Sequence, residues 1–342
     1  MKTILVTGGA GFIGSRFVKR ILQNQPDTKV IVLDALTYAG STDNLPMDFE
    51  DSPRIEFWQG NVTNVELVEE LVSRSHIIYH FAAETHVTRS IFSNRVFVDT
   101  DVIGTHVLSN AIVKHRDQIE LFVHISTSEV YGTALSEKID ESHPLNPMSP
   151  YASAKTGADR LVYSYWATYK IPAVIVRPFN NYGAHQHLEK VIPRFITSCI
   201  LDEPLIVHGT GEAARDWIFV EDTCDFLEKL LFSAKNDIVG EVFNLGTGTH
   251  TSIMQIAHLV ADLMKVKNPK IELIQDRPGQ VLRHTCDYSK ASSTTDWTPA
   301  TSLEEGLLKT IQWYQTHPDW WQKQLSFRHF PIFLEDGTKV MH

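Results

Sequence analysis

The first two-thirds of the chain alternates short apolar runs with longer amphipathic segments. The apolar runs, which we expect to be strands, are residues 4–6, 30–33, 55–58, 77–81, 121–125 and 173–176. The amphipathic segments, which we expect to be helices, include residues 12–22, 65–73, 95–114 and 152–169. Continuous runs rich in β-branched residues are typical of strands buried on both faces. Strands alternating with helices therefore predict an α/β fold, a doubly wound parallel sheet with helices on both faces.

The pattern loosens after about residue 180. Helices are expected at 191–201, 223–233 and 303–314, with glycine turns at 209–211 and 246–248. The apolar run 242–245 is a strand that could rejoin the main sheet. We therefore expect a second, smaller α/β domain that is discontinuous, made of residues 181–240 and 247–330 and followed by a polar tail at 331–342.

A glycine-rich run, Thr-Gly-Gly-Ala-Gly-Phe-Ile-Gly-Ser, follows the first expected strand and opens the first helix. Gly8, Gly11 and Gly14 allow a tight turn and a close approach of the backbone to a pyrophosphate, and the helix N-terminus offers free N–H donors. This context, more than the glycine spacing alone, predicts a dinucleotide site. We assign residues 1–180, with the returning strand near 241–246, to a Rossmann domain that binds NAD.

Asp34 ends the second expected strand, twenty residues beyond Gly14. A carboxylate at this position can accept hydrogen bonds from the ribose hydroxyls and would repel a 2′-phosphate, which favours NAD over NADP. The alternative is an aspartate that only caps the turn after the strand.

Polar side chains follow the strand at 121–125, in the order Ser126, Thr127, Ser128 and Glu129. Ligands bind at this edge of open α/β sheets. Tyr151 and Lys155 have an i, i+4 spacing and so share one helix face. A neighbouring ammonium favours the phenolate, which predicts a lowered pKa for Tyr151 and a general base for a sugar hydroxyl. The alternative is a surface pair of no catalytic role.

Several motifs together resemble the extended short-chain dehydrogenase/reductases, and among them the nucleotide-sugar 4,6-dehydratases, with the dTDP-glucose enzymes the nearest pattern. Besides the glycine run and Tyr-x-x-x-Lys at 151–155, the motifs lie at 34–40, 80–87, 180–183, 189–193, 215–217 and 276–279. They occur in the family's order and cover nearly the whole chain. Tyr-x-x-x-Lys alone indicates only the superfamily, whereas the set is specific.

The resemblance implies a mechanism. Tyr151 takes the C4 hydroxyl proton while hydride passes from C4 to NAD, and Thr127 hydrogen-bonds the same oxygen. Glu129 then removes the C5 proton, the C6 hydroxyl leaves as water, and hydride returns to C6. The product is a 4-keto-6-deoxy sugar.

Ser128 departs from the dTDP-glucose pattern, which has an aspartic acid there. Thr-Ser-Glu resembles GDP-mannose dehydratases and some dehydratases of UDP- or GDP-N-acetylglucosamine, in which the glutamate can serve as base and then as acid. Gln280 and Val281 also replace the usual His-Asp. We rank dTDP-glucose first and a UDP sugar such as UDP-N-acetylglucosamine second, and leave the nucleotide and the hexose open.

Further site residues are carried over from the resemblance, and a structural role stays open for each. The cofactor set adds Phe12, Ile13, Thr37, Asn61, Val62, Phe81, Ala82, Ala83 and Thr100. The substrate set is His86, Arg89, Asn180, Asn181, Lys190, Arg215, Asn244 and Arg283.

Composition limits the partners. The formal net charge of -10 gives no electrostatic reason to expect nucleic acid or an anionic membrane. Three scattered cysteines and an isolated His185-x-His187 pair predict neither a disulfide framework nor a metal site. With no secretory signal and no apolar run of about 18 residues, we expect a cytoplasmic protein. A homodimer is expected from the resemblance alone.

Other functions on the same scaffold stay open. A C4 epimerase needs no C5 base, so Glu129 speaks against it. A UDP-glucuronate decarboxylase would need a basic group for the substrate carboxylate. A catalytically idle NAD-binding regulator is the alternative of another class, and the complete set of Thr127, Glu129, Tyr151 and Lys155 speaks against it.

Overall fold

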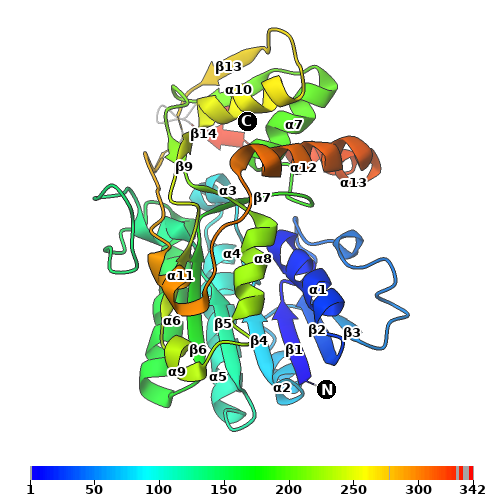
Figure 1. Cartoon of the computed structure of the whole chain (residues 1–342), viewed down its shortest axis with the longest axis vertical. Helices are drawn as coiled ribbons and strands as arrows, with labels where there is room; N and C mark the ends of the chain where they lie inside the picture. The colour runs from blue at the N-terminus through cyan, green and yellow to red at the C-terminus, as the bar shows by residue number, and fades with distance from the viewer. Residues whose placement is uncertain (1, 277, 329–330, 334–338, 342) are drawn as a thin grey trace.

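A seven-stranded parallel sheet forms the centre of the computed structural model, which describes all residues except 1, 277, 329–330, 334–338 and 342 (Figure 1). The strand order is β11-β6-β5-β4-β1-β2-β3. The strands are β1 Lys2–Thr7, β2 Thr28–Asp34, β3 Ile55–Gln59, β4 Ile77–His80, β5 Leu121–Ile125, β6 Ala173–Pro178 and β11 Val242–Leu245. The predicted doubly wound sheet is confirmed, and β11 rejoins it beside β6.

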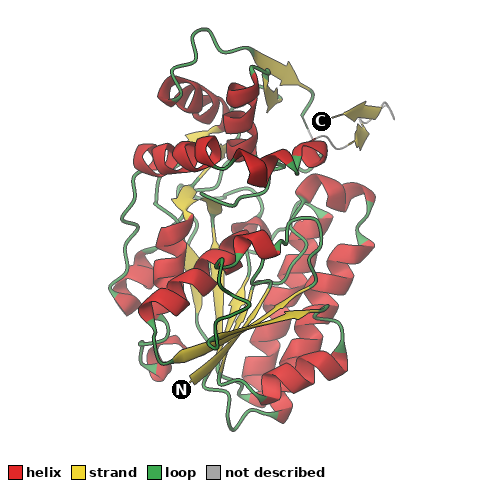
Figure 2. Ribbon diagram, turned by 90° about the vertical axis from the view of Figure 1, so that its right-hand side faces the viewer, coloured by secondary structure: helices red, strands yellow, loops and turns green. Residues whose placement is uncertain are grey.

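Helices cover both faces of the sheet (Figure 2). They are α1 Phe12–Asn24 and α8 Val220–Lys229 on one face, and α2 Val65–Ser73, α5 Gly104–Lys114 and α6 Pro150–Tyr169 on the other. Successive side chains of a strand point to opposite faces. In β1, Ile4 and Val6 therefore join one core with Phe17 of α1, whereas Leu5 joins the other with Leu108 of α5.

The predicted helix 95–114 is interrupted. It consists of α4 Arg95–Phe97, a π-helical turn η2 at Val98–Ile103, and α5. A short helix, α3 Val87–Phe92, precedes it. By length and composition Arg95–Lys114 could cross a membrane, but half of its most apolar stretch is buried inside the protein. Core helices of soluble proteins pass the same criterion.

A second layer lies above the carboxyl ends of the strands (Figure 1). It contains α7 Val191–Leu201, β8 Leu205–His208, α10 Ile253–Leu263, β13 Ile271–Ile274, α12 Leu303–Thr316 and α13 Pro318–Gln322. Phe195, Val207, Val260 and Leu307 belong to its separate core. Two small sheets connect the layers, β7 Asn180–Tyr182 with β10 Trp217–Phe219, and β9 Ala214–Arg215 with β12 Thr251–Ser252. Short 3-10 turns are η1 Thr42–Asn44, η3 Ser128–Tyr131 and η4 Leu325–Arg328.

The cores divide the chain differently from the predicted ranges. Helices α8, α9 Lys235–Ile238 and α11 Ser289–Thr295 fall in the ranges predicted for the smaller domain, yet Phe226, Ile238 and Ala291 pack in the core of the main sheet. An amphipathic pattern shows that a helix has a buried face, but it does not show which sheet that face covers. In the predicted tail, the described residues form β14 Pro331–Phe333 and β15 Lys339–Met341, which pair antiparallel.

Candidate active site

A cavity of about 450 Å³ lies between the carboxyl edge of the sheet and the second layer. All predicted cofactor residues line it, namely Gly8, Gly11, Phe12, Ile13, Gly14, Asp34, Thr37, Asn61, Val62, Phe81, Ala82, Ala83, Thr100, Tyr151 and Lys155. Of the other predicted residues, it is lined by Thr127, Glu129, His86, Asn180, Asn181, Lys190 and Arg215. Residues far apart in the sequence therefore meet in one cavity.

The glycine loop has the backbone that a dinucleotide cradle requires. Gly8 has a φ of +69°, and a Cβ built on it would lie 2.5 Å from the backbone nitrogen of Ala82. A Cβ on Gly14 would lie 2.3 Å from the carbonyl oxygen of Gly8. Any side chain at these positions would push apart β1, β4 and the start of α1. The N-cap residue of α1 is Gly11, which has no side chain to cap the helix, and this helix N-terminus borders the cavity. The loop thus fits a pyrophosphate.

Asp34 ends β2 at the edge of the cavity. Its Oδ2 accepts a hydrogen bond from the N–H of Ala10 at 2.9 Å, and Oδ1 accepts one from the N–H of Leu36 at 2.8 Å. Burial raises the pKa of this carboxyl, and the two hydrogen bonds oppose the shift. The bond to Leu36 shows that Asp34 also caps the turn. Because a carboxylate has about four acceptor positions, two remain for ribose hydroxyls.

Thr127 and Glu129 begin the turn η3, directly after β5. The Oγ1 of Thr127 accepts a hydrogen bond from the N–H of Glu129 at 3.2 Å, which closes the turn. The Oε1 of Glu129 lies 4.0 Å from Nε of Arg215, a residue of β9. Ser128, between them in sequence, is buried and does not line the cavity.

Tyr151 and Lys155 lie on the first turns of α6. The Oγ of Ser149 accepts a hydrogen bond from the N–H of Ala152 at 3.1 Å, so the helix begins just before Tyr151. The Nζ of Lys155 donates to the carbonyl oxygen of Ile125 at 2.7 Å, which ties α6 to the end of β5. Both side chains are buried and line the cavity.

The predicted lowering of the Tyr151 pKa is wrong for the polypeptide by itself. Burial raises the pKa of Tyr151, and the negative charges of Asp101 and Glu129 raise it further, against a hydrogen bond with Thr127 that lowers it. The charge of Lys155 is balanced by carboxylates around it, so it does not offset the loss of water around the phenol. A spacing of four residues shows a shared helix face but not the other charges nearby.

Comparison with known proteins identifies the family. The family model described as GDP-mannose 4,6 dehydratase matches residues 5–310. The chain belongs to this family. It is 42% identical over 311 residues to the low-salt glycan biosynthesis protein Agl12 of Haloferax volcanii, covering 91% of this chain and 98% of that protein. It is 38% identical over 325 residues to dTDP-glucose 4,6-dehydratase of an Actinoplanes species, covering 93% and 99%.

A solved structure of the same family has the same fold. The dTDP-glucose 4,6-dehydratase DesIV of Streptomyces venezuelae, solved with NAD and TYD bound, superposes with a TM-score of 0.89. The identity is 37%, and the match covers 94% of this chain and 99% of that one. The resemblance to nucleotide-sugar 4,6-dehydratases is therefore confirmed.

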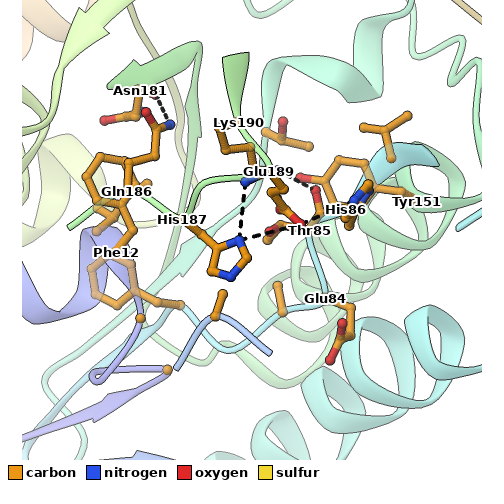
Figure 3. A pocket seen from close by; sticks show the side chains of 18 of the residues that line it. Phe12, Glu84, Thr85, His86, Tyr151, Asn181, Gln186, His187, Glu189 and Lys190 are labelled. Atoms are coloured by element: carbon orange, nitrogen blue, oxygen red, sulfur yellow. Dashed lines mark hydrogen bonds and ion pairs between the residues drawn. The ribbon is translucent and has the colours of Figure 1, made fainter. Parts of the chain in front are cut away.

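Glu189, part of the motif at 189–193, has a buried side chain and lines the cavity. The Oε1 of Glu189 accepts hydrogen bonds from the hydroxyl of Tyr38 at 2.9 Å and lies 3.0 Å from Nζ of Lys190. Its Oε2 lies 3.3 Å from Nε2 of His86, so Glu189 stands between Lys190 and His86 (Figure 3). Burial would raise the pKa of Glu189, but the charges of Lys190, His86 and His187 outweigh it and lower the pKa.

The second layer contributes further residues that no motif predicted. Arg194 from α7 and Arg328 from η4 line the same cavity, as do Gln186 and His187. The pair His185 and His187 is the nearest the sequence comes to a metal-binding motif. Among the described residues no group of three or more His, Cys, Asp and Glu side chains could hold a metal ion.

Three of the predicted substrate residues lie outside the cavity lining. Asn244 is fully buried, where its Oδ1 accepts from the hydroxyl of Tyr131 and its Nδ2 donates to the carbonyl of Ile139, so its amide is satisfied within the core. Arg283 donates to the carbonyl oxygens of Ser136 and Glu137. Arg89 pairs with Glu84 and covers the ring of Tyr38. Arg277, in the motif at 276–279, lies outside the described residues.

Proposed function

We propose that this chain is an NAD-dependent 4,6-dehydratase of a nucleotide-linked hexose, with dTDP-glucose the first candidate and a UDP sugar such as UDP-N-acetylglucosamine the second. One observation supports this most: Thr127, Glu129 and Tyr151 line the same cavity as the glycine loop and Asp34. A base for a hydroxyl, a base for a carbon acid and a dinucleotide cradle within one cavity are what the reaction requires. Dehydratases of dTDP-glucose among the relatives favour that substrate.

In the first step the chain removes a proton from the C4 hydroxyl. NAD, when bound, supplies the acceptor for the C4 hydride and later returns it to C6. Tyr151 takes the hydroxyl proton, and Thr127, its hydrogen-bond partner, orients the same oxygen. Lys155, held by the carbonyl of Ile125, provides positive charge beside the phenolate. General base catalysis of this kind typically contributes about 10²–10⁴ in rate.

In the second step one carboxylate moves a proton across the C5–C6 bond. The C4 ketone acidifies C5–H, and Glu129 takes that proton, which leaves an enolate across C4 and C5. The C5–C6 double bond then forms as the C6–O bond breaks, and Glu129 gives the proton to the departing oxygen, which leaves as water. C5 regains a proton from solvent when hydride reaches C6. Glu129 alone carries the proton in this scheme, which agrees with the position of Ser128 outside the cavity lining.

The remaining cavity residues are proposed to bind the substrate. Lys190 and Arg215 supply positive charge for the diphosphate, and Arg forks suit phosphate oxygens bidentately. His86, Asn180 and Asn181 are proposed to contact the hexose or the phosphates. On this proposal the sheet layer holds the cofactor and the second layer holds the nucleotide, so the substrate lies between two separate cores.

A UDP-glucuronate decarboxylase is the alternative reaction on this scaffold. Arg215, which lies close to Glu129, would supply the basic group that binds the substrate carboxylate. Product analysis separates the candidates. The purified protein should be incubated with dTDP-glucose, UDP-N-acetylglucosamine, GDP-mannose and UDP-glucuronate, and the products analysed by mass spectrometry. A dehydratase gives a product lighter by one water, a decarboxylase one lighter by carbon dioxide, and an epimerase one of unchanged mass. No change with any of them would indicate an NAD-binding protein without this activity.

We also propose that the protein is a cytoplasmic homodimer. Its three cysteines are free, as expected in a reducing compartment. Large apolar side chains, Val98, Ile103, Tyr163 and Tyr169, are exposed on the helix containing η2 and on α6. Two such helices from each of two copies would bury these side chains in a four-helix bundle. Light scattering should give twice the mass of one chain, and Ile103→Glu should shift it to the monomer.

A further inference from the structure

Asp101 is a buried carboxyl beside the proposed base, and no motif assigned it a role. It lies in the π-helical turn η2, and Thr100, its neighbour in the same turn, lines the cavity. Turns of this type inside α-helices are frequent at functional sites. The hydroxyl of Thr105 donates to the carbonyl oxygen of Asp101 at 2.5 Å and is bonded in turn to His80. The turn is thus held in place by side chains of the core.

One oxygen of the Asp101 side chain has a hydrogen-bond partner, whereas the other has none among the described residues. Oδ1 accepts a hydrogen bond from the N–H of Glu84 at 2.9 Å. Oδ2 is buried and has no hydrogen-bond partner among the residues that the structure describes. A buried carboxylate oxygen without a partner is costly, so its retention calls for an explanation. The charged groups around Asp101 explain why this carboxylate is retained.

Lys155 is the buried cation whose charge acts on Asp101, and its helix α6 packs against η2. Its ammonium is fully buried and has three donors, of which one goes to the carbonyl of Ile125. Burial lowers the pKa of Lys155, and the charges of Asp101 and Asp159 raise it. Asp159 is already bound at 2.8 Å by both Nε and Nη2 of Arg177. Within the described part of the chain, Asp101 is therefore the carboxylate left to balance Lys155.

The other charged groups around this pair come from every element packed against it. Tyr151 and Asp159 lie on α6, His80 on β4, His124 on β5, and Glu84 on the loop after β4. Burial lowers the pKa of both histidines, so they are neutral near pH 7 and do not replace either charge. Burial raises the pKa of Asp101 to about 7, with Lys155 opposing the shift.

We propose that Asp101 is a positioning residue of this site, the counter-charge of Lys155, and that its negative charge sets the pH range in which Lys155 and Tyr151 hold the protonation states needed for catalysis. This inference rests on the proposed function only for the roles of Tyr151 and Lys155. A negative charge favours the ammonium and disfavours the phenolate, so it raises the pKa of both groups. Its removal must lower both.

The test is Asp101→Asn in the enzyme purified with its cofactor. The carboxamide keeps an oxygen for the N–H of Glu84 and removes the charge. The alkaline limb of the pH profile of kcat lies above the pKa of about 7 at which Asp101 ionises, and it should move to lower pH by about one unit, a tenfold change in acidity. KM for the nucleotide sugar should change little. In protein labelled with ¹³C at the lysine ε-carbon, the titration midpoint of Lys155, assigned by its absence in Lys155→Met, should also fall.

A matched control removes a charge from the same turn at the surface. Asp99 lies in η2, is paired with Arg95, and its side chain is 41% exposed. Asp99→Asn should therefore leave the limbs of the pH profile and the titration midpoint of Lys155 in place. Asp101→Ser repeats the test if the carboxamide does not fit. A lower rate with unmoved limbs and an unmoved Lys155 midpoint would overturn the proposal and leave Asp101 a structural residue. If no nucleotide sugar is converted by the unsubstituted enzyme, the proposed function fails, but the Lys155 titration still decides this inference.

Discussion

The guanidinium of Arg215 lies 4.0 Å from the carboxylate of Glu129, measured from Nε to Oε1. Glu129 follows a strand of the central sheet, whereas Arg215 belongs to the short strand β9 that leads into the second layer. The proposed C5 base and its neighbouring cation therefore come from different layers. The proposed elimination site is therefore complete only when the two layers are docked.

Glu129→Gln should stop elimination while leaving C4 oxidation intact. The carboxamide is nearly the same size but cannot take up the C5 proton, so turnover should fall by roughly a hundredfold or more. Reduced cofactor should then accumulate on addition of substrate, measured by its absorbance, and exchange of C5–H with solvent deuterium should be slowed. A variant that shows neither signal would remove Glu129 from the mechanism.

Ser128→Ala should have a small effect, on the order of tenfold or less, because only a hydrogen bond is lost. The serine is buried outside the cavity lining and cannot deliver a proton to C6 in the proposed scheme. The measurement is the rate of 4-keto-6-deoxy product formation beside that of the Glu129 variant. If Ser128→Ala oxidises C4 but does not release water, the single-carboxylate scheme must be abandoned.

Tyr151→Phe should abolish C4 oxidation, with a loss of roughly a hundredfold or more, because the C4 hydroxyl keeps its proton. The matched control is Tyr163→Phe on the same helix. Tyr163 is 42% exposed, so this substitution should leave the rate unchanged. Stopped-flow absorbance of the reduced cofactor measures the step directly. Near-normal oxidation by a folded Tyr151→Phe protein would contradict the assignment.

Asp34 should select NAD. Denaturation of the purified protein should release NAD or NADH, identified by chromatography. Asp34→Ser should weaken cofactor retention, because it removes the ribose acceptor together with the acceptor of the Ala10 N–H. Release of NADP as the sole nucleotide would defeat this prediction.

Asp159→Asn should destabilise the fold by about 3–5 kcal/mol at pH 7, because it leaves the buried charge of Arg177 unbalanced. Burial would raise the pKa of Asp159, but hydrogen bonds and charge from Arg177 outweigh it and lower the pKa. A carboxyl with a lowered pKa stabilises the fold above its unfolded pKa of about 3.9 and loses that contribution as the pH falls.

The difference between the unsubstituted protein and Asp159→Asn in urea unfolding should therefore shrink as the pH falls below about 4. Glu120→Gln is the control, since it breaks the exposed pair with Lys2 and should cost at most about 1 kcal/mol. Equal losses of unfolding free energy in the two variants would show that burial of the Arg177–Asp159 pair does not increase its contribution to stability.

The layout of the central sheet and the shared helix face of Tyr151 and Lys155 were predictable from local patterns. The strands are apolar runs buried on both faces, and Gly8 and Gly14 occur where a Cβ would collide with the backbone of neighbouring elements. Such requirements act over a few residues and leave a visible pattern. Tyr151 and Lys155 share a helix face for the same reason, and both line the cavity.

Only the tertiary structure decided which residues of the second layer face the cavity and which charges surround them. Asn244 lies in a core and Arg283 binds backbone carbonyls, whereas Glu189 and Arg194 line the cavity. The pKa of Tyr151 is raised because burial and nearby carboxylates act together across elements. Burial and charge depend on the distance between segments far apart in the chain, and a linear pattern of polar and apolar residues does not contain that distance.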